Sequence, residues 1–342
     1  MRTKLIALFL VLISPFILFS CDSVKTKEYY DLFNTVTTVQ SYANDTKREF
    51  KENCDTVYSV LSEYHKLFDI YHEYSGINNL ATVNRLAGKE SVKVDGRLID
   101  FLLYAKDMHV LTGGKTNIAI GALSSLWHAE REAAKKENST PKLPSDATLT
   151  EAAKHISIDS LIIDKDSSTV FLSDPEASLD VGAIAKGYAA EMAKRALTEL
   201  GVSGYVINAG GNICALGEKP DGSGWLTSIR NPHGEGYSAS FRIKDICCVT
   251  SGDYERFYTV DGKRYHHLID ESTLYPAEYF SSVTVFTGNS ALADTLSTAL
   301  FMMSLEDGKK LISTLTDVEV LWISKLGELT MTDGLRGLQV NQ

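Results

Sequence analysis

An acidic and a hydroxyl side chain stand four residues apart near the C-terminal end of the chain. Asp294 and Thr298 lie in the segment ALADTLSTALFMM, whose apolar pattern predicts a helix. Residues four apart in a helix share one face, so the carboxylate and the hydroxyl can offer two hard oxygen atoms to a divalent cation. The same spacing also suits a solvent-facing aspartate and a threonine that hydrogen-bonds to a helix carbonyl. The spacing alone leaves both interpretations open.

A second candidate binding segment is DVGAIAKGY (180–188), at the start of a predicted helix. Its two glycines are unexpected, because glycine inside a helix costs about 1 kcal/mol relative to alanine. Asp180 stands at an N-cap-like position, and Lys186 falls where a phosphate can meet an ammonium group and free backbone N–H groups. Equally, the aspartate can cap the helix, the small residues can allow tight packing, and the lysine can face solvent. Neither GxGxxG nor GxxxxGK[ST] occurs in this segment.

Two adjacent histidines, His266 and His267, occur in the segment YHHLID. In a strand they face opposite sides, so one can face a site while the other lies at the surface or in the core. The HxH and HExxH spacings typical of histidine-bound metals are absent from this segment. The glycine-containing segments 208–212 and 250–254 predict either tight turns or backbone that is open to a ligand.

The composition restricts the partners that the chain can bind. The 342 residues carry a formal net charge of -10 and are 44% hydrophobic, and the pI is about 5.3. Such an acidic chain is not expected to bind nucleic acid through a broad basic surface. Any phosphate group must therefore be held locally, by a few placed side chains or by a cation.

The N-terminus has the pattern of a secretion signal: two basic residues precede an apolar run over 5–19. The following LFSC resembles the bacterial lipobox, so we predict a lipoprotein signal peptide over 1–20 and a lipidated Cys21 with its tether over 21–28. Asp22 resembles the inner-membrane retention signal of some lipoproteins, which favours a lipid anchor on the periplasmic side of that membrane. An uncleaved anchor is the alternative, and it also places the remaining chain outside the cytoplasm.

Four further cysteines, Cys54, Cys214, Cys247 and Cys248, contain no CxxC pair and no zinc-site spacing. Adjacent cysteines in a strand point to opposite faces and rarely bridge each other. We expect all four to be small buried side chains. One disulfide among them can form, but the sequence does not assign its partners.

The elements that must position these groups alternate between helices and strands. Helical patterns cover 49–71, 97–113, 180–201, 289–304 and 306–314, and the polar stretch 128–146 predicts a solvated helix end and loop. Strand patterns cover 33–42, 204–211, 225–230, 238–243, 246–251, 281–286, 318–324 and 329–334, with hairpins over 161–174 and 257–269. Many strands are antiparallel neighbours and no linker divides the chain, which favours an α+β fold.

The order of five segments is more specific than any one of them. DVGAIAKGYAAE, VINAGGNI, TSGDYERF, YHHLID followed by YP, and ADTLSTALF resemble in turn the FAD:protein FMN transferase family, also called ApbE. The resemblance runs from about Phe33 to the C-terminus. It implies a single domain over 29–342, related to the tunnelling fold, with mixed antiparallel sheets and packed helices.

The resemblance also implies a set of site residues. The Ala183 carbonyl, Asp294 and Thr298 are expected to hold Mg²⁺, and His267 is the expected catalytic residue. The expected FAD contacts are Tyr71, Lys115, Thr116, Asn117, Asp180, Lys186 and Leu268.

The implied reaction is Mg²⁺-dependent transfer of FMN from FAD to a threonine or serine hydroxyl of a partner protein, with release of AMP. The hydroxyl attacks the FMN-side phosphorus, and His267 orients or deprotonates it. The expected acceptors are NqrC-type or RnfG-type subunits or flavin reductase domains. One alternative is an FAD pyrophosphatase, in which water replaces the hydroxyl, although a tyrosine at position 71 favours transfer. The other is a lipoprotein that binds FAD without catalysis.

Overall fold

A computed structural model of the chain describes residues 24–340 and confirms a mixed α+β fold with antiparallel sheets. The predicted signal peptide over 1–20 and the predicted lipidation site Cys21 lie outside the described residues. The largest sheet has the strand order β1 (Lys25–Leu32), β2 (Thr35–Ser41), β6 (Tyr205–Ala209), β7 (Asn212–Leu216), β10 (Cys247–Gly252), β15 (Phe280–Thr287), β16 (Val318–Ser324) and β17 (Leu329–Met331). Every neighbouring pair in this sheet is antiparallel.

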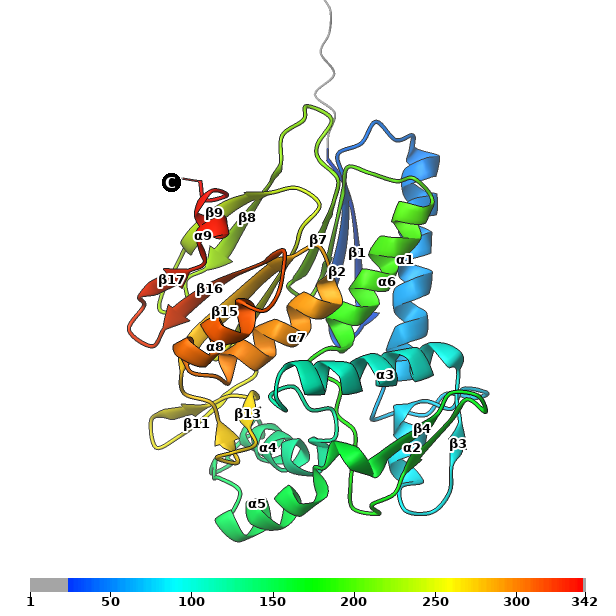
Figure 1. Cartoon of the computed structure of the whole chain (residues 1–342), viewed down its shortest axis with the longest axis vertical. Helices are drawn as coiled ribbons and strands as arrows, with labels where there is room; N and C mark the ends of the chain where they lie inside the picture. Colours follow the sequence, from blue (N-terminus) through cyan, green and yellow to red (C-terminus); the bar gives the residue numbers. More distant parts are fainter. Residues whose placement is uncertain (1–23, 341–342) are drawn as a thin grey trace, which may run out of the picture.

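The three helices α1 (Lys47–Phe68), α6 (Ala185–Glu199) and α7 (Ser290–Phe301) cover one face of this sheet (Figure 1). Their sequences explain why they form. The α1 segment begins at a capping box, in which the Thr46 and Glu49 side chains satisfy each other's backbone N–H groups, and its buried residues fall at helical spacing. On the other face of the sheet, the hairpin β8 (Trp225–Arg230) and β9 (Tyr237–Ile243) packs with α9 (Asp333–Arg336) over a separate apolar core.

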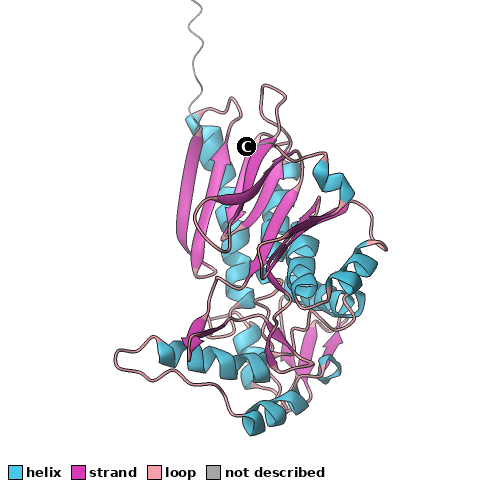
Figure 2. Cartoon of the chain, turned by 90° about the vertical axis from the view of Figure 1, so that its left-hand side faces the viewer, coloured by secondary structure: helices cyan, strands magenta, loops and turns pink. Residues whose placement is uncertain are grey.

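The remaining elements gather beyond one end of the large sheet (Figures 1 and 2). The helices there are α2 (Leu80–Arg85), α3 (Gly96–Leu111), α4 (Gly121–Ala134) and α5 (Asp146–Ala152), with the short turns η1 (Ala153–His155) and η2 (Ile158–Ser160), while α8 (Leu305–Ile312) follows α7. The short strands are β3 (Val92–Lys93), β4 (Leu161–Asp164), β5 (Thr169–Leu172), β11 (Tyr258–Val260), β12 (Lys263–Tyr265), β13 (Ile269–Asp270) and β14 (Tyr275–Pro276). Among the described residues, no helix is both long and apolar enough to cross a membrane.

Two elements begin elsewhere than the sequence suggests. The strand β1 starts at Lys25, inside the segment 21–28 expected to be a tether, because its pairing with β2 begins at Lys25 opposite Ser41. Most β1 side chains are exposed, so the sequence has no apolar alternation that would predict this edge strand.

The helix α6 starts at Ala185, so Asp180 is not its N-cap as the sequence suggested; the N-cap is Ile184, which makes no side-chain cap. Residues 180–184 instead form a turn. Its first residue donates its backbone N–H to the Ile118 carbonyl at 2.7 Å, which ties the turn to the segment before α4. The turn therefore belongs to the wall between the helices and the end of the sheet.

Gly187 is one of the two unexpected glycines, and the close contact between α6 and α7 at this position explains it. A Cβ atom at this position would lie 2.3 Å from the Asp294 Cβ and 2.5 Å from the Ser290 carbonyl oxygen. The missing side chain lets the Gly187 N–H donate to the Asp294 Oδ2 at 2.7 Å. Close helix packing, and not local flexibility, therefore requires glycine at this position.

We predict that Gly187→Ala destabilises the fold by about 1–3 kcal/mol, because the added methyl group meets backbone that cannot move aside. Urea unfolding followed by circular dichroism measures this change. Gly96→Ala is the matched control, since Gly96 also lies in the first turn of a helix but nothing lies within 4 Å of its added Cβ atom. Equal stability of the two variants would contradict the packing explanation.

Candidate functional site

A cavity of about 990 Å³ opens beside the contact between α6 and α7. It is lined by the β1–β2 turn, α4, the 180–184 turn, the end of β10 and one face of α7. All of the site residues expected within the described chain line this cavity: Tyr71, Lys115, Thr116, Asn117, Asp180, Ala183, Lys186, His267, Leu268, Asp294 and Thr298. The fold thus brings together segments that are more than 200 residues apart in the sequence.

The oxygen atoms expected to hold a cation converge at one end of the cavity. The Thr298 hydroxyl donates to the Ala183 carbonyl at 3.5 Å, and the Ser251 hydroxyl lies 3.3 Å from the Thr298 Oγ1. Asp294 lies one helical turn before Thr298 and is 6% exposed. Ser251 was not among the expected ligands, although it belongs to the TSGDYERF segment.

These groups fit a magnesium ion that shares its coordination with a substrate. Burial raises the pKa of Asp294, so an isolated charge on this carboxylate is unfavourable and a bound cation would stabilise it. Magnesium in nucleotide sites usually takes one or two protein carboxylates and completes its shell with phosphate oxygens and water. The described residues contain no cluster of three or more His, Cys, Asp or Glu side chains around one metal position.

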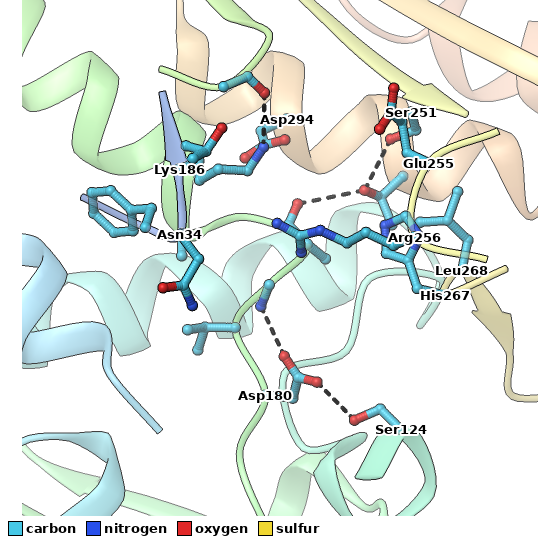
Figure 3. Close-up of a pocket in the computed structure, with 18 of the residues that line it drawn as sticks. Asn34, Ser124, Asp180, Lys186, Ser251, Glu255, Arg256, His267, Leu268 and Asp294 are labelled. Carbon is cyan, nitrogen blue, oxygen red and sulfur yellow. Dashed lines mark hydrogen bonds between the residues drawn. The ribbon is translucent and has the colours of Figure 1, made fainter. Parts of the chain in front are cut away.

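Three cationic side chains reach the cavity without a carboxylate partner among residues 24–340. The Lys186 Nζ donates to the Gly210 carbonyl at 3.3 Å, and the Arg131 guanidinium contacts the His128 Nδ1 at 2.7 Å. Arg256 follows β10 with a left-handed backbone φ of 44° and reaches into the cavity from the side opposite Lys186 (Figure 3). Burial lowers the pKa of both Lys186 and Arg131. An anionic ligand would compensate this concentration of positive charge.

The helix α4 contributes more to the site than the sequence indicated. Arg131 lies in the stretch 128–146, which was expected to be solvated, yet it lines the cavity. Ser124, His128 and Arg131 recur at helical spacing on the same side, and this spacing is the signal that could have identified them. The Ser124 hydroxyl donates to the Asp180 Oδ2 at 2.7 Å, which joins α4 to the 180–184 turn (Figure 3).

Tyr71 lies at the mouth of the cavity. Its side chain is 60% exposed, and its ring lies 5.7 Å from the His128 ring, between centroids. The Asp69 carboxylate orients this loop by accepting the backbone N–H groups of Tyr71 and His72 at 2.8 and 3.0 Å. An exposed ring beside another aromatic ring offers a stacking surface for a flat ligand.

The adjacent histidines have different surroundings, as the sequence suggested, but they lie in the bend between β12 and β13 and not in the expected strand. His266 is 4% exposed, its Nε2 lies 2.9 Å from the Ala277 carbonyl, and its Nδ1 accepts the Leu268 N–H at 3.2 Å. His267 lines the cavity, and its Nδ1 is buried without a hydrogen-bond partner in the described chain. Burial and the nearby Arg256 lower the pKa of His267 to about 3. Its imidazole is therefore neutral at pH 7 in the ligand-free protein.

The segment 115–117 forms a wall of the cavity. The Lys115 Nζ pairs with the Asp270 Oδ1 at 3.0 Å. Thr116 is 1% exposed and donates its hydroxyl to the Thr295 carbonyl at 3.2 Å, while the Asn117 Nδ2 donates to the Ile156 carbonyl at 2.8 Å. Because these side chains already have protein partners, they hold α7 and the cavity wall in place. Direct side-chain contacts of Thr116 and Asn117 with a ligand remain an expectation from the resemblance.

We predict that His267 does not titrate between pH 5 and pH 8 in the ligand-free protein, since its pKa lies near 3. Histidine ring signals in NMR spectra recorded across this range measure the titration, and a His267→Gln variant assigns the signal.

His155 is the internal control, because its hydrogen bond with Asp174 raises its pKa above the ordinary value. Its signal should therefore shift at a higher pH than that of an ordinary histidine. A midpoint near pH 6.5 for His267 would show that the imidazole is solvated. The low pKa also means that the unfolded chain binds this proton more tightly, so His267 reduces the stability of the folded state progressively as the pH falls from 6.5 towards 3.

Comparisons with known proteins match both the fold and the sequence. A curated FAD:protein FMN transferase of Treponema pallidum is 31% identical over 308 residues, which cover 85% of this chain and 82% of the relative. A relative of the same name from Klebsiella pneumoniae is 28% identical, over 82% of this chain and 84% of its own. The crystal structure of an ApbE protein from Thermotoga maritima has a TM-score of 0.81 at 25% identity and covers 93% of this chain and all of its own.

The fold agrees further with a flavin transferase of Vibrio cholerae, which has a TM-score of 0.77 at 23% identity, over 92% of this chain and all of its own. The model of the ApbE family matches residues 33–322, a range that contains every site residue discussed above. The chain therefore belongs to the ApbE family.

Proposed function

We propose that the chain is an FAD:protein FMN transferase that uses Mg²⁺, attaches FMN to a threonine or serine hydroxyl of a partner protein and releases AMP. The observation that carries the proposal is the meeting of three kinds of group in one cavity. They are the Ala183, Asp294 and Thr298 oxygens, three cations without a carboxylate partner in the described part of the chain, and a neutral histidine. Curated relatives over more than four fifths of the chain bear the name of this activity.

The cations and the oxygen cluster are both placed to neutralise the negative charge of the reacting pyrophosphate. Lys186 and Arg256 reach the cavity from opposite sides (Figure 3), so a diphosphate between them would meet positive charge on both flanks. Ala183, Asp294 and Thr298 would hold Mg²⁺, which when bound neutralises phosphate charge and stabilises the charge that develops on the leaving group. The flavin ring would lie towards the exposed Tyr71 or the apolar Leu268, both of which line the cavity.

The chemical step exchanges one phosphorus–oxygen bond for another. The acceptor hydroxyl oxygen bonds to the FMN-side phosphorus, and the bond between this phosphorus and the bridging oxygen breaks, so that oxygen leaves with AMP. His267 has a neutral ring whose Nδ1 has no hydrogen-bond partner among the described residues, so it can orient the acceptor hydroxyl. Taking the hydroxyl proton would require the bound pyrophosphate to offset the Arg256 charge and raise the pKa of His267. His266 supports this geometry, because its own hydrogen bonds fix the backbone next to His267.

We also propose that Cys21 carries a lipid and that the domain works outside the cytoplasm, on the periplasmic side of the inner membrane. The LFSC sequence after an apolar run supports this location. The acceptor would then be an extracytoplasmic flavoprotein, such as an NqrC-type or RnfG-type subunit or a flavin reductase domain. Mass spectrometry of the membrane-extracted protein tests the anchor, because an unprocessed Met1 or an unmodified Cys21 would contradict it.

The decisive test incubates the chain from Asp22 onward, which keeps every described element, with FAD and Mg²⁺, with and without a candidate acceptor. We expect AMP release only with the acceptor, together with an acceptor mass gain of one FMN group. Release of AMP and free FMN without acceptor would instead indicate a pyrophosphatase. Binding of FAD with no AMP in either mixture would indicate a storage protein.

We predict that Asp294→Asn slows AMP release on the order of 100-fold at saturating FAD, because loss of the carboxylate charge removes several kcal/mol of metal-dependent stabilisation. The rate is measured across a range of Mg²⁺ concentrations, with FAD binding followed by flavin fluorescence. Asp107→Asn is the control, since Asp107 is an exposed helical aspartate outside the cavity. An unchanged Mg²⁺ dependence in Asp294→Asn would exclude this residue as a metal ligand.

A further inference from the structure

Two of the four described cysteines face each other across neighbouring strands. Cys247 in β10 lies directly opposite Cys214 in β7, and Cys248 lies opposite Ile213. The residue pair before them is hydrogen-bonded, since Ala215 donates its N–H to the Ile246 carbonyl at 3.2 Å. Hydrogen-bonded and non-hydrogen-bonded pairs alternate along an antiparallel ladder, so the cysteines form a non-hydrogen-bonded pair.

This kind of pair brings side chains closest together. Opposite Cα atoms in non-hydrogen-bonded pairs are about 4.5 Å apart, which lies within the range of about 4.4–6.8 Å found across disulfides. The neighbouring Cys214 is the largest cause that raises the pKa of the Cys247 thiol, and burial adds to it. Both residues are fully buried and pack in the same core, between the sheet and the helices α1 and α6.

Neither of the other two cysteines is placed to form a disulfide with Cys214 or Cys247. Cys248 points to the opposite face of the sheet and packs in the core beneath β8 and β9. Cys54 lies on α1, and its pKa is raised mainly by burial. The strand register therefore distinguishes one pair among cysteines that the sequence could not assign.

The pair also lies where the ladder between two strands of the large sheet is shortest. The ladder between β7 and β10 consists of the two residue pairs at Cys247 and Cys248, whereas β6–β7 and β10–β15, on either side, extend over five and six pairs. The cavity spans this junction, because Gly210 belongs to the turn before β7 and Ser251 to β10. A covalent link at this point would join the two halves of the sheet that together form the site.

We infer that Cys214 and Cys247 form a disulfide that links β7 to β10 when the chain folds in an oxidising compartment. The inference does not depend on the transferase activity. It requires a disulfide oxidant, either a dithiol–disulfide oxidoreductase or glutathione disulfide. Because both thiols are buried in the folded chain, the bond forms before α6 covers the sheet.

The exchange proceeds in two balanced steps. The Cys247 thiolate attacks one sulfur of the oxidant, which releases a thiolate that takes up a proton. The Cys214 thiolate then attacks the Cys247 sulfur and expels the second thiolate of the oxidant. The two cysteines lose two electrons and two protons, and the oxidant gains them as two thiols. The balance is the same if Cys214 attacks first, because the product and the released thiols do not change.

The test folds the chain from Asp22 onward in a glutathione redox buffer, unfolds it without reductant and alkylates the free thiols. We expect two alkylated cysteines, Cys54 and Cys248, and one crosslinked peptide that joins Cys214 to Cys247. Four alkylated cysteines, or a crosslink that involves Cys54 or Cys248, would overturn the inference. This measurement needs no variant and no enzyme activity, so its outcome is separate from that of the transferase assay.

A thermal measurement adds a second readout. The bridge closes a loop of roughly 30 residues, so reductant should lower the Tm of the oxidised protein by about 5–10 °C. Cys247→Ser should remove this sensitivity to reductant, whereas Cys54→Ala should retain it. Equal Tm values with and without reductant in the unaltered protein would contradict a stabilising bridge.

Discussion

The hydrogen bond from the Gly187 backbone to the Asp294 carboxylate is the contact on which the site depends. It requires α6 and α7 to approach so closely that no side chain fits between them at this point. The same contact buries a carboxylate, and a buried carboxylate must be compensated by cations or hydrogen bonds. Lys186 precedes the glycine, and Thr298 follows the aspartate by one helical turn. One backbone contact therefore fixes the relative positions of the phosphate-binding and metal-binding groups.

The cavity brings cations together although the whole chain is acidic, and its lining also includes the carboxylates Asp69, Asp180, Glu255 and Asp294. The chain carries a net charge of -10, yet Arg131, Lys186 and Arg256 meet in one cavity without carboxylate partners among the described residues. Exposed charges are screened beyond about 8 Å at physiological ionic strength, so the acidic surface has little influence on a ligand that is already inside the cavity. These local cations, and not the net charge, determine what the site attracts, and burial lowers the pKa of Lys186 and Arg131.

Sequence periodicity predicted the elements whose buried faces are regular. The helix α1 and the strands β2, β10 and β16 carry clear apolar patterns and form near the expected positions. The edge strand β1 has no such pattern, since its side chains are mostly exposed, and its pairing with β2 could not be read from composition. Arg131 was missed because a charged side chain on a polar helix end normally faces solvent, and only the placement of α4 turns it towards the cavity. The internal hydrogen bonds of Thr116 and Asn117 could not be predicted either, because their partners are distant in the sequence. One partner lies in α7 and the other in the connection between η1 and η2.

The small number of residues between Cys21 and β1 limits how far the cavity can lie from a membrane anchor. With Cys21 lipidated as proposed, three residues separate it from Lys25, and the four steps along the chain span at most roughly 14 Å. The eight residues of β1 add about 26 Å, and the turn at Phe33 and Asn34 then lines the cavity. The edge of the cavity at this turn would thus stay within roughly 40 Å of the membrane surface. Acceptors anchored in the same membrane, with their modified hydroxyl in this layer, would meet the enzyme by lateral diffusion, whereas a site held further out would be beyond its reach.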